Sequence, residues 1–470
     1  MRAAVFGLFL SLAVTAVAAD PPPLRAPIDE MVEGIACASD PSQTYTLYLP
    51  PGFTSERRWP VLLVFDPRGR SVLAAELFRE AARDYGWIIV SSNDTQSDGP
   101  MEPNIKALNA LWPEVHTRLP ADFKRIYAAG FSGGGAVAYI LSRSTHQVAG
   151  IVACGARHLP DDLKSIDTPI FSTAGDTDFN YREMHLVDAF LADQGNLHRL
   201  EVFEGPHSWM PPALARETVE WMELEAMRSG LRERDPELVE ALYSRDVAAA
   251  EELAGGGREL DAARRYRAVE RTFEGLRDTG EARRRAEALE SSSEVRRQQK
   301  DEKRWDAFEF AYIRQSGSPL ALLRSSDIPP PVSQLARELR IEEMLRRSQQ
   351  PGIEGLTARR ALQSPYAALS FYFPRDFLAE GRWAHLATSL ELALLIREDN
   401  PTAWYNLACA RARTNHPGAA VEALERALEA GLERPELLAT DSDLDTLRER
   451  QDFQELARHS HRVSTADGGS

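Results

Sequence analysis

Cysteine is scarce in this sequence of 470 residues: its three thiols, Cys37, Cys154 and Cys409, lie far apart. That spacing matches neither a zinc motif nor a disulfide framework, although a single Cys37–Cys154 bridge stays open. Positively charged residues are also relatively few: the sequence has 55 Lys and Arg against 71 Asp and Glu, which gives a net charge of -16. We therefore expect no nucleic-acid partner, since this charge would repel phosphates.

Long hydrophobic runs are missing except near the N-terminus. There, Arg2 is followed by an apolar run from Ala3 to Val17 and by small residues before Asp20. This order is typical of a secretory signal, and the run is too short to span a bilayer comfortably. The sequence predicts a signal peptide over residues 1–19 and a secreted or periplasmic protein with no membrane span after cleavage. An uncleaved anchor is the alternative.

Short apolar segments of β-prone residues alternate with segments of helical length between Thr44 and Phe203. Several of the apolar segments are hydrophobic on both faces, as buried parallel strands are. We therefore expect an α/β fold with a mainly parallel sheet and helices on both faces. The expected strands are residues 45–49, 61–65, 87–92, 125–131, 148–154, 169–175 and 200–205. The expected helices are residues 72–85, 104–118, 134–144 and 181–193.

The sequence beyond Ala213 has no further strand-like segment and is rich in Ala, Leu, Glu and Arg, which favour helix. Glycines within residues 254–260 and prolines within residues 325–333 interrupt this helical part. We predict an α/β domain over residues 20–230, an all-α domain over residues 231–462 and a disordered tail over residues 463–470.

Four glycines surround Ser132 in the segment GFSGGG at residues 130–135. The segment lies where an expected strand meets an expected helix, and it fits the G-x-S-x-G pattern of a nucleophile elbow, a sharp turn that needs very small neighbours. We expect Ser132 to be a nucleophile and the Gly133 amide to face the oxyanion formed during its attack. A glycine-rich turn that only packs a helix onto a sheet is the alternative.

A serine nucleophile needs a histidine base, and the base needs an acid that orients it. In this architecture the acid and the base follow later strands, in the order Ser, Asp, His. His207 lies in the loop GPHSWMPP just past the last expected strand and is the favoured base. His158, past an earlier strand, is a distant second candidate.

Two aspartates compete for the role of the acid in the turn GDTD at residues 175–178. Asp176 directly follows the glycine and more naturally makes the turn with its own side chain. Asp178, two residues further on, can reach under the histidine. We therefore favour Asp178 and keep Asp176 as the alternative.

In these motifs and in their order, residues from about Thr44 to Met227 resemble the α/β-hydrolase superfamily, and most closely the compact secreted esterases of the feruloyl esterase and polyhydroxyalkanoate depolymerase type. Those esterases often show Gly-x-His-x-Trp around the base, as Gly205, His207 and Trp209 do here. The resemblance implies a serine carboxylesterase that forms an acyl-enzyme on a small-molecule or polymer-linked ester, with no metal or organic cofactor. A serine peptidase or a thioesterase would use the same triad.

The loop after the first core strand departs from those esterases. They usually carry a His-Gly pair there, and the amide that follows completes the oxyanion hole, whereas this chain has DPRGR at residues 66–70. Pro67 has no N–H, so we assign the donor to Arg68, with Gly69 as the alternative. This departure keeps a non-catalytic binding module open as a second function. Residues 155–167 are too few to hold an inserted lid, so we expect an open site.

Residues 400–431 resemble a tetratricopeptide repeat. Trp404, Leu407 and Ala408 are followed at helical spacing by small residues of a second helix, although Arg411 stands where an aromatic residue is usual. Because one repeat cannot bury its own face, at least three helical pairs should stack. We expect a helical-repeat domain that binds a protein partner, with Trp404 and Leu407 in its core. An ordinary helical bundle is the alternative.

Overall fold

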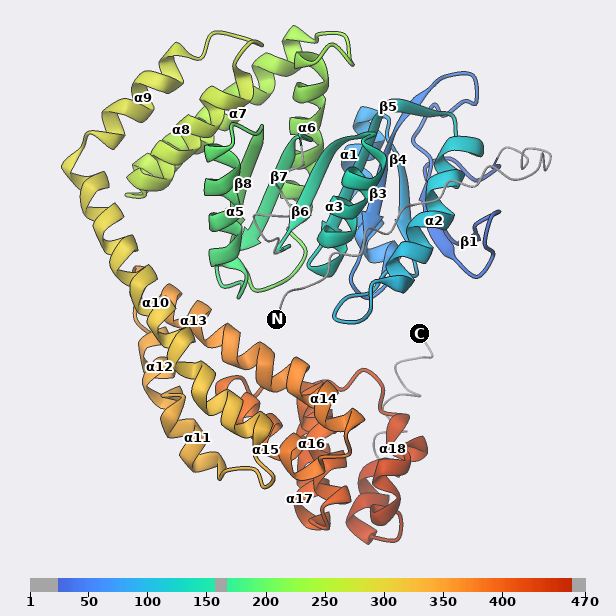
Figure 1. The fold of residues 1–470 in the computed structure, drawn as a ribbon, viewed down its shortest axis with the longest axis vertical. Coiled ribbons are helices and arrows are strands. Elements are labelled where there is room, and N and C mark those ends of the chain that lie inside the picture. The colour runs from blue at the N-terminus through green and yellow to red at the C-terminus, as the bar shows by residue number, and fades with distance from the viewer. Residues whose placement is uncertain (1–23, 157–166, 459–470) are drawn as a thin grey trace. The chain divides into compact units, whose positions relative to one another are not determined.

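The computed structural model describes residues 24–156 and 167–458 (Figure 1). The expected signal peptide, the expected C-terminal tail and His158 lie outside the described residues. The chain divides into two compact units, Met1–Gln299 and Lys300–Ser470. Within the part of the chain that is described, no helix combines the length and the apolar character that crossing a membrane requires.

The first unit is built on an eight-stranded sheet in the order β1-β2-β4-β3-β5-β6-β7-β8 (Figure 1). β2 runs antiparallel to its neighbours β1 and β4, and the other strand pairs are parallel. This sheet confirms the expected α/β fold, and every expected strand is present. The strands are β1 (Met31–Ala36), β2 (Thr44–Tyr48), β3 (Trp59–Phe65), β4 (Ile88–Ser92), β5 (Ala121–Phe131), β6 (Val148–Cys154), β7 (Ile170–Gly175) and β8 (His198–Phe203).

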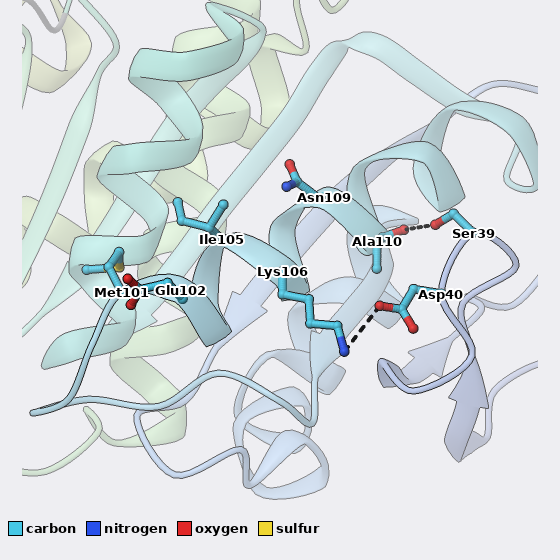
Figure 2. A pocket seen from close by; sticks show the side chains of 8 residues that line it. All are labelled: Ser39, Asp40, Met101, Glu102, Ile105, Lys106, Asn109 and Ala110. Atoms are coloured by element: carbon cyan, nitrogen blue, oxygen red, sulfur yellow. Dashed lines mark hydrogen bonds and ion pairs between the residues drawn. The ribbon is translucent and has the colours of Figure 1, made fainter. Parts of the chain in front are cut away.

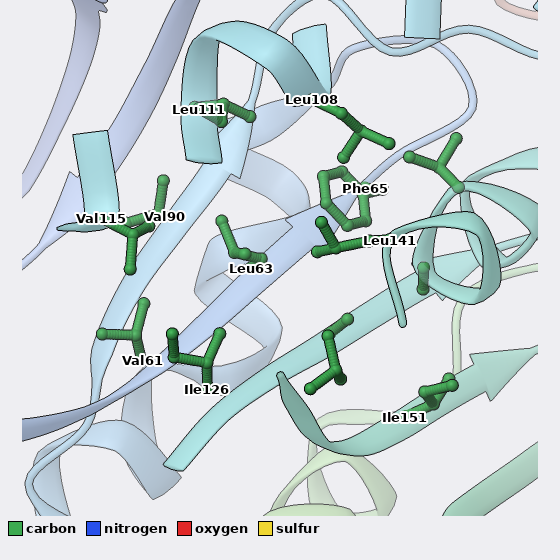
Figure 3. Close-up of a cluster of buried hydrophobic side chains, with 14 of the residues drawn as sticks. Val61, Leu63, Phe65, Val90, Leu108, Leu111, Val115, Ile126, Leu141 and Ile151 are labelled. Carbon is green, nitrogen blue, oxygen red and sulfur yellow. The ribbon is translucent and has the colours of Figure 1, made fainter. Parts of the chain in front are cut away.

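Strand β3 illustrates why these segments form the centre of the sheet. All of its residues are buried, and successive side chains point to opposite faces of the sheet. Val61, Leu63 and Phe65 join one hydrophobic cluster (Figure 3), whereas Leu62 and Val64 join another. A strand that is apolar on both faces is stable only when helices cover both faces.

The helices of the α/β part supply that cover. Side chains of α2, α3 and α5 belong to the same cluster as Val61, and side chains of α1 and α6 belong to the same cluster as Leu62. Figure 3 draws Leu108 and Leu111 of α2 and Leu141 of α3 within the first cluster. The helices are α1 (Ser71–Tyr85), α2 (Glu102–Thr117), α3 (Gly133–Thr145), α5 (Tyr181–Asp193) and α6 (Pro212–Arg228).

Strand β1 is the described strand that the sequence analysis missed. It pairs with β2 at the edge of the sheet, and none of its side chains is fully buried. Glu33 and Gly34 interrupt its apolar residues, and the register shifts between Val32 and Ile35. An irregular edge strand needs neither a continuous apolar run nor strict alternation, so it leaves little signal in the sequence.

The structure does not contain the disulfide bridge between Cys37 and Cys154 that the sequence left open, so that possibility is wrong. Both residues are buried free thiols. Cys37 directly follows β1 at the edge of the sheet, whereas Cys154 ends β6. Four other strands separate β1 from β6, and neighbouring strands lie about 4.8 Å apart, so the two thiols are far beyond disulfide reach.

Three more helices belong to the first compact unit: α7 (Pro236–Gly255), α8 (Glu259–Phe273) and α9 (Gly280–Glu290). α8 packs against both α7 and α9, and Arg199 of β8 forms an ion pair with Asp246 of α7. The sequence predicted a domain boundary after residue 230, whereas the first compact unit continues to Gln299. Ion pairs between residues so distant in sequence leave no local signal that would have extended the domain.

The second unit contains helices in its described residues, and no strand occurs among them. The proline-rich break expected at residues 325–333 lies between α10 and α11, and α10 begins just before the boundary between the units. The helices are α10 (Ser293–Ser325), α11 (Val332–Glu338), α12 (Ile341–Ser348), α13 (Gly352–Ala367), η1 (Ala368–Tyr372), α14 (Phe373–Ala379), α15 (Trp383–Ile396), α16 (Pro401–Arg413), α17 (Pro417–Glu429), α18 (Leu437–Thr440) and η2 (Ser442–Leu447).

Helices α15, α16 and α17 pack on one another in sequence order. Small residues such as Ala408 and Ala420 are fully buried between them, which lets the helix backbones approach closely. Leu407 lies in this core, as expected. Trp404 is only partly buried and packs against this core, and its indole N–H donates to the Glu398 carbonyl at 2.7 Å.

Candidate active site

Ser132 lies in a sharp turn between β5 and α3. Its φ is 52° and its ψ is -121°, in a region that residues other than glycine rarely adopt. The Ser132 N–H donates to the Cys154 carbonyl at 2.8 Å, and the Ser132 carbonyl accepts from the Gly135 N–H at 3.0 Å. The strained backbone is therefore held from both sides at the carboxyl ends of β5 and β6.

The glycines around Ser132 are required by close backbone contacts. A Cβ atom on Gly130 would lie 2.1 Å from the Gly134 carbonyl oxygen, and one on Gly134 would lie 1.9 Å from the Phe65 carbonyl oxygen. No real Cβ approaches a backbone atom so closely, so any side chain at either position would distort the turn. The same holds, at 2.2 Å, for Gly133 against the Ser97 side chain and for Gly135 against the Ala156 side chain.

The structure brings three predicted site residues into direct contact. His207 Nε2 lies 2.9 Å from Ser132 Oγ, and His207 Nδ1 lies 2.9 Å from both carboxylate oxygens of Asp178. The Asp178 side chain is fully buried, whereas the imidazole remains partly exposed. The imidazole contacts the rings of Phe131 and Phe179, with centroid distances of 4.6 Å and 4.2 Å. A serine hydroxyl, an imidazole and a carboxylate thus form one hydrogen-bonded row.

Two residues that the sequence analysis did not single out shape the Asp178–His207 contact. Gly155 has a φ of +52°, and a Cβ on it would lie 2.8 Å from Asp178 Oδ2 and 3.1 Å from His207 Nδ1. The Asn180 backbone N–H donates to Asp178 Oδ1 at 2.7 Å, and the Asn180 side chain donates to the Gly155 carbonyl at 2.9 Å. Glycines and amides in loops are common, so neither residue carried a signal in the sequence.

Asp176, the alternative acid, contacts the backbone of the histidine loop. Its Oδ1 accepts from the Gly205 N–H at 3.1 Å. Thr177 adds a second bond to the same residue, because its hydroxyl donates to the Gly205 carbonyl at 2.8 Å. Asp176 therefore holds the start of the loop that carries His207, and Asp178 holds the imidazole itself.

The two predicted oxyanion donors differ in their surroundings. Gly133 is the first residue of α3, where backbone N–H groups have no intrahelical partner. The Arg68 N–H, by contrast, donates to Asp66 Oδ1 at 2.8 Å, and the Gly69 N–H donates to the Asp66 carbonyl at 3.2 Å. In this conformation both candidate amides of the loop are thus engaged by Asp66, which the sequence analysis had treated only as part of the departing motif.

Asp66 is itself a buried carboxylate with several donors. Its Oδ2 accepts from the indole N–H of Trp209 at 2.8 Å, and Arg70 donates to both of its oxygens at 3.0 Å and 2.9 Å. Burial alone would raise the pKa of Asp66, but the bonds from Arg70, Trp209 and the Arg68 amide hold the pKa below its usual value. Asp66 is therefore charged at neutral pH although its side chain is closed to solvent.

A cleft of about 580 Å³ lies between α2 and the turn that precedes β2 (Figure 2). Lys106 and Asp40 form an ion pair of 3.4 Å across it, and both side chains are at least one-third exposed. None of Ser132, Asp178 and His207 lines this cleft. Its lining residues are Ser39, Asp40, Met101, Glu102, Ile105, Lys106, Asn109 and Ala110.

One group in the second unit has ligand atoms close enough to hold a metal ion: those of Cys409, Asp441 and Asp443 lie within 4.8 Å of one another. Asp441 already accepts a hydrogen bond from the Tyr405 hydroxyl at 2.7 Å. Burial raises the pKa of the Cys409 thiol to about 12, so the thiolate that would bind a metal is disfavoured. We assign no metal to this group.

Comparisons with known proteins give distant similarities. No protein-family model matches the sequence. A curated chloroplastic protein of Arabidopsis thaliana is 28% identical over 130 residues, which cover 27% of this chain and 35% of that protein. The chain therefore spans about a third of the length of this relative.

Several solved structures of hydrolases are similar to part of the chain. FphF, a fluorophosphonate-binding serine hydrolase of Staphylococcus aureus, is 15% identical with a TM-score of 0.33 over 38% of this chain and 92% of FphF. A ferulic acid esterase is 18% identical with a TM-score of 0.32, and the match covers 38% of this chain and 91% of the esterase. The S-formylglutathione hydrolase FrmB of Staphylococcus aureus is 14% identical with a TM-score of 0.35, and the match covers 41% of this chain and 98% of FrmB.

The chain's own topology defines the class of its fold. The sheet is parallel except at β1 and β2, and the serine lies in a strained turn between the fifth strand and the helix that follows. Asp178 follows β7 and His207 follows β8, so the three side chains occur in the order Ser, Asp, His. This arrangement is the α/β-hydrolase fold.

Proposed function

We propose that this chain is a serine hydrolase, and specifically a carboxylic ester hydrolase that works through an acyl-enzyme. The observation that carries the proposal is the row of contacts from Ser132 Oγ to His207 Nε2 and from His207 Nδ1 to Asp178, each 2.9 Å long. These distances suit proton transfer and orientation of the imidazole. The chemistry needs neither a metal nor an organic cofactor.

In the proposed reaction, Ser132 Oγ attacks the ester carbonyl carbon while His207 Nε2 accepts its proton. Asp178 keeps the other imidazole nitrogen protonated and stabilises the imidazolium. His207 then gives its proton to the leaving alcohol, and the acyl group stays on Ser132. A water molecule, deprotonated by His207, attacks the acyl-enzyme and releases the acid.

The Gly133 amide, at the N-terminus of α3, is the first proposed donor to the oxyanion. The second donor remains the Arg68 amide, which would have to leave Asp66 Oδ1 when substrate binds, and the Gly69 amide is the alternative. This engaged amide favours a second candidate function, a non-catalytic binding module on a hydrolase scaffold. Loss of one oxyanion donor typically lowers turnover about a hundredfold or more.

The proposed substrate is a small-molecule or polymer-linked ester. A serine peptidase or a thioesterase would use the same three side chains, so a substrate panel has to separate these activities. We also propose that the protein is secreted or periplasmic, which the apolar run from Ala3 to Val17 supports. For the second unit we propose tetratricopeptide-like pairs that bind a protein partner, supported by the packing of α15, α16 and α17 through buried alanines.

A fluorophosphonate probe and a panel of p-nitrophenyl esters of rising chain length test the proposal. The probe should label Ser132, found by peptide mapping, and Ser132→Ala should lose both the label and the turnover. Thioester and peptide substrates assayed in parallel decide between the related activities. A folded protein that neither reacts with the probe nor cleaves any substrate would favour the non-catalytic module.

A further inference from the structure

The loop that carries His207 is attached to the rest of the fold on both sides of the histidine. Two residues before His207, the backbone of Gly205 is hydrogen-bonded to the side chains of Asp176 and Thr177. Two residues after it, the Trp209 indole N–H donates to Asp66 Oδ2 at 2.8 Å. Between β8 and α6 the loop contains one glycine and two prolines and has no regular secondary structure. The position of the imidazole therefore depends on these two attachments.

The attachment at Trp209 joins two loops that flank the proposed nucleophile. Asp66 directly follows β3, and Trp209 follows β8, so 143 residues separate the two partners. Trp209 is nearly buried and packs on Phe131 and Phe78, with ring centroids 5.7 Å and 6.1 Å away. Phe131 in turn contacts the His207 ring. A shift of the indole would thus be passed to the imidazole through both the backbone and Phe131.

Apolar contacts alone leave a ring free to slide, whereas a hydrogen bond to a buried charge fixes its orientation. Asp66 is suited to this task because Arg70 and the Arg68 amide also donate to its carboxylate and hold it in place. Without the Asp66 carboxylate, the buried indole N–H of Trp209 would lose its hydrogen-bond acceptor, which would destabilise the folded state. The same carboxylate also sets the conformation of the loop proposed to complete the oxyanion hole.

We propose that Asp66 is a positioning residue: through Trp209 it holds His207 in line with Ser132, and through the Arg68 amide it sets the loop after β3. This inference rests on the proposed function, because it assigns a role in the same reaction. It explains two features of the sequence together. Trp209 of the Gly-x-His-x-Trp motif needs an acceptor, and Asp66 of the departing DPRGR loop is that acceptor.

The test compares Trp209→Phe and Asp66→Asn with Trp87→Phe in the full chain. Trp209→Phe keeps an aromatic ring but removes the N–H donor together with part of the ring volume, and Trp87→Phe shares this loss of volume. Asp66→Asn keeps the shape, but its amide can accept on one oxygen only. Trp87 is a matched control, since its buried indole N–H, directly before β4, donates to the buried carboxylate of Glu223 on α6.

We expect Trp209→Phe and Asp66→Asn to lower kcat on a p-nitrophenyl ester by about ten- to a hundredfold, because a misplaced catalytic group costs about that much. KM should change little, and the far-downfield proton resonance of His207 Nδ1–H should shift or broaden. Trp87→Phe should reduce stability by a similar amount and change neither kcat nor the resonance. If Trp209→Phe and Trp87→Phe have equal effects on kcat and on the resonance, the inference is overturned.

Failure of the proposed function is recognised separately. It would appear in the unchanged chain, as absence of turnover and of fluorophosphonate labelling at Ser132. In that case the resonance of His207 still decides the inference, since its readout is geometric and needs no turnover. A resonance that Trp209→Phe leaves unchanged would then overturn the positioning role, and one that only Trp209→Phe and Asp66→Asn perturb would support it.

Discussion

Arg199 of β8 and Asp246 of α7 form an ion pair of 3.2 Å in which both side chains are almost closed to solvent. The Arg199 guanidinium also donates to Glu201 and Glu217, and Arg265 of α8 pairs with the same three carboxylates. So many buried charges are tolerated only while each has partners. Helices α7 and α8 are therefore tied to the sheet by electrostatics, beyond the apolar contacts of α6 and α7.

Asp246→Ala should destabilise the first unit strongly. Removing this carboxylate takes one partner from each of Arg199 and Arg265 in a buried place, so we expect the free energy of unfolding to fall by about 3 kcal/mol. Glu240→Ala on the same helix is the control, because Glu240 is exposed and pairs with Arg277 at the surface. Its loss should cost less than about 1 kcal/mol. Urea denaturation measures both, and equal losses would contradict the structural role of Asp246.

The stability of the first unit should also depend on pH through Glu225 of α6. Burial raises the pKa of this carboxyl group to about 7, and the nearby Arg228 only partly opposes the shift. Glu225 releases its proton above about pH 4.3 in the unfolded chain but keeps it to a higher pH in the folded chain. The protonated carboxyl group therefore contributes its full stabilisation below about pH 4.3. This stabilisation is lost as the pH rises to about 7.

The measurement is urea denaturation at several pH values across that window. We expect the free energy of unfolding to fall by up to about 4 kcal/mol between the two pKa values, since each pKa unit corresponds to about 1.4 kcal/mol. Glu225→Gln cannot titrate and should lack this part of the slope. A difference between the variant and the unchanged chain that stays constant with pH would contradict the shifted pKa.

The sequence predicted the central sheet because its strands are apolar on both faces, and it placed Ser132, Asp178 and His207 at the ends of β5, β7 and β8. These strands lie within four successive parallel strands of the sheet, so their carboxyl ends lie along one edge and local motifs were enough. It could not predict that Asp66 accepts from Trp209, or that Arg199 pairs with Asp246. Such contacts join side chains distant in sequence, and a lone Asp or Arg in a loop or strand has no local pattern that reveals its partner.

The two aspartates after β7 should differ in their effect on turnover. In Asp178→Asn the His207 ring loses its charged partner and its preferred tautomer, so we expect kcat to fall by about ten-thousandfold. In Asp176→Asn the remaining side-chain oxygen can still accept from the Gly205 N–H, so most of the turnover should remain. Ester hydrolysis by the two purified variants checks this order, and the reverse order would assign the acid to Asp176.

Gly155 offers a test of how closely the Asp178–His207 contact is packed. In Gly155→Ala the new methyl group would lie 2.8 Å from Asp178 Oδ2 and 3.1 Å from His207 Nδ1, so one of the two side chains has to move. Gly195→Ala is the matched control, because Gly195 also has a positive φ, at +72°, but a Cβ there meets nothing within 4 Å. Both variants bear the cost of a left-handed backbone, about 1–2 kcal/mol.

We therefore expect similar losses of stability in the two alanine variants and a difference in kcat alone. Gly155→Ala should lower ester turnover by about a hundredfold, the usual effect of a displacement near 1 Å, while Gly195→Ala should leave it unchanged. Thermal denaturation and ester assays on the same preparations separate the two effects. A fully active Gly155→Ala variant would contradict this prediction. It would show that Asp178 and His207 tolerate the methyl group and that their close packing is not needed for turnover.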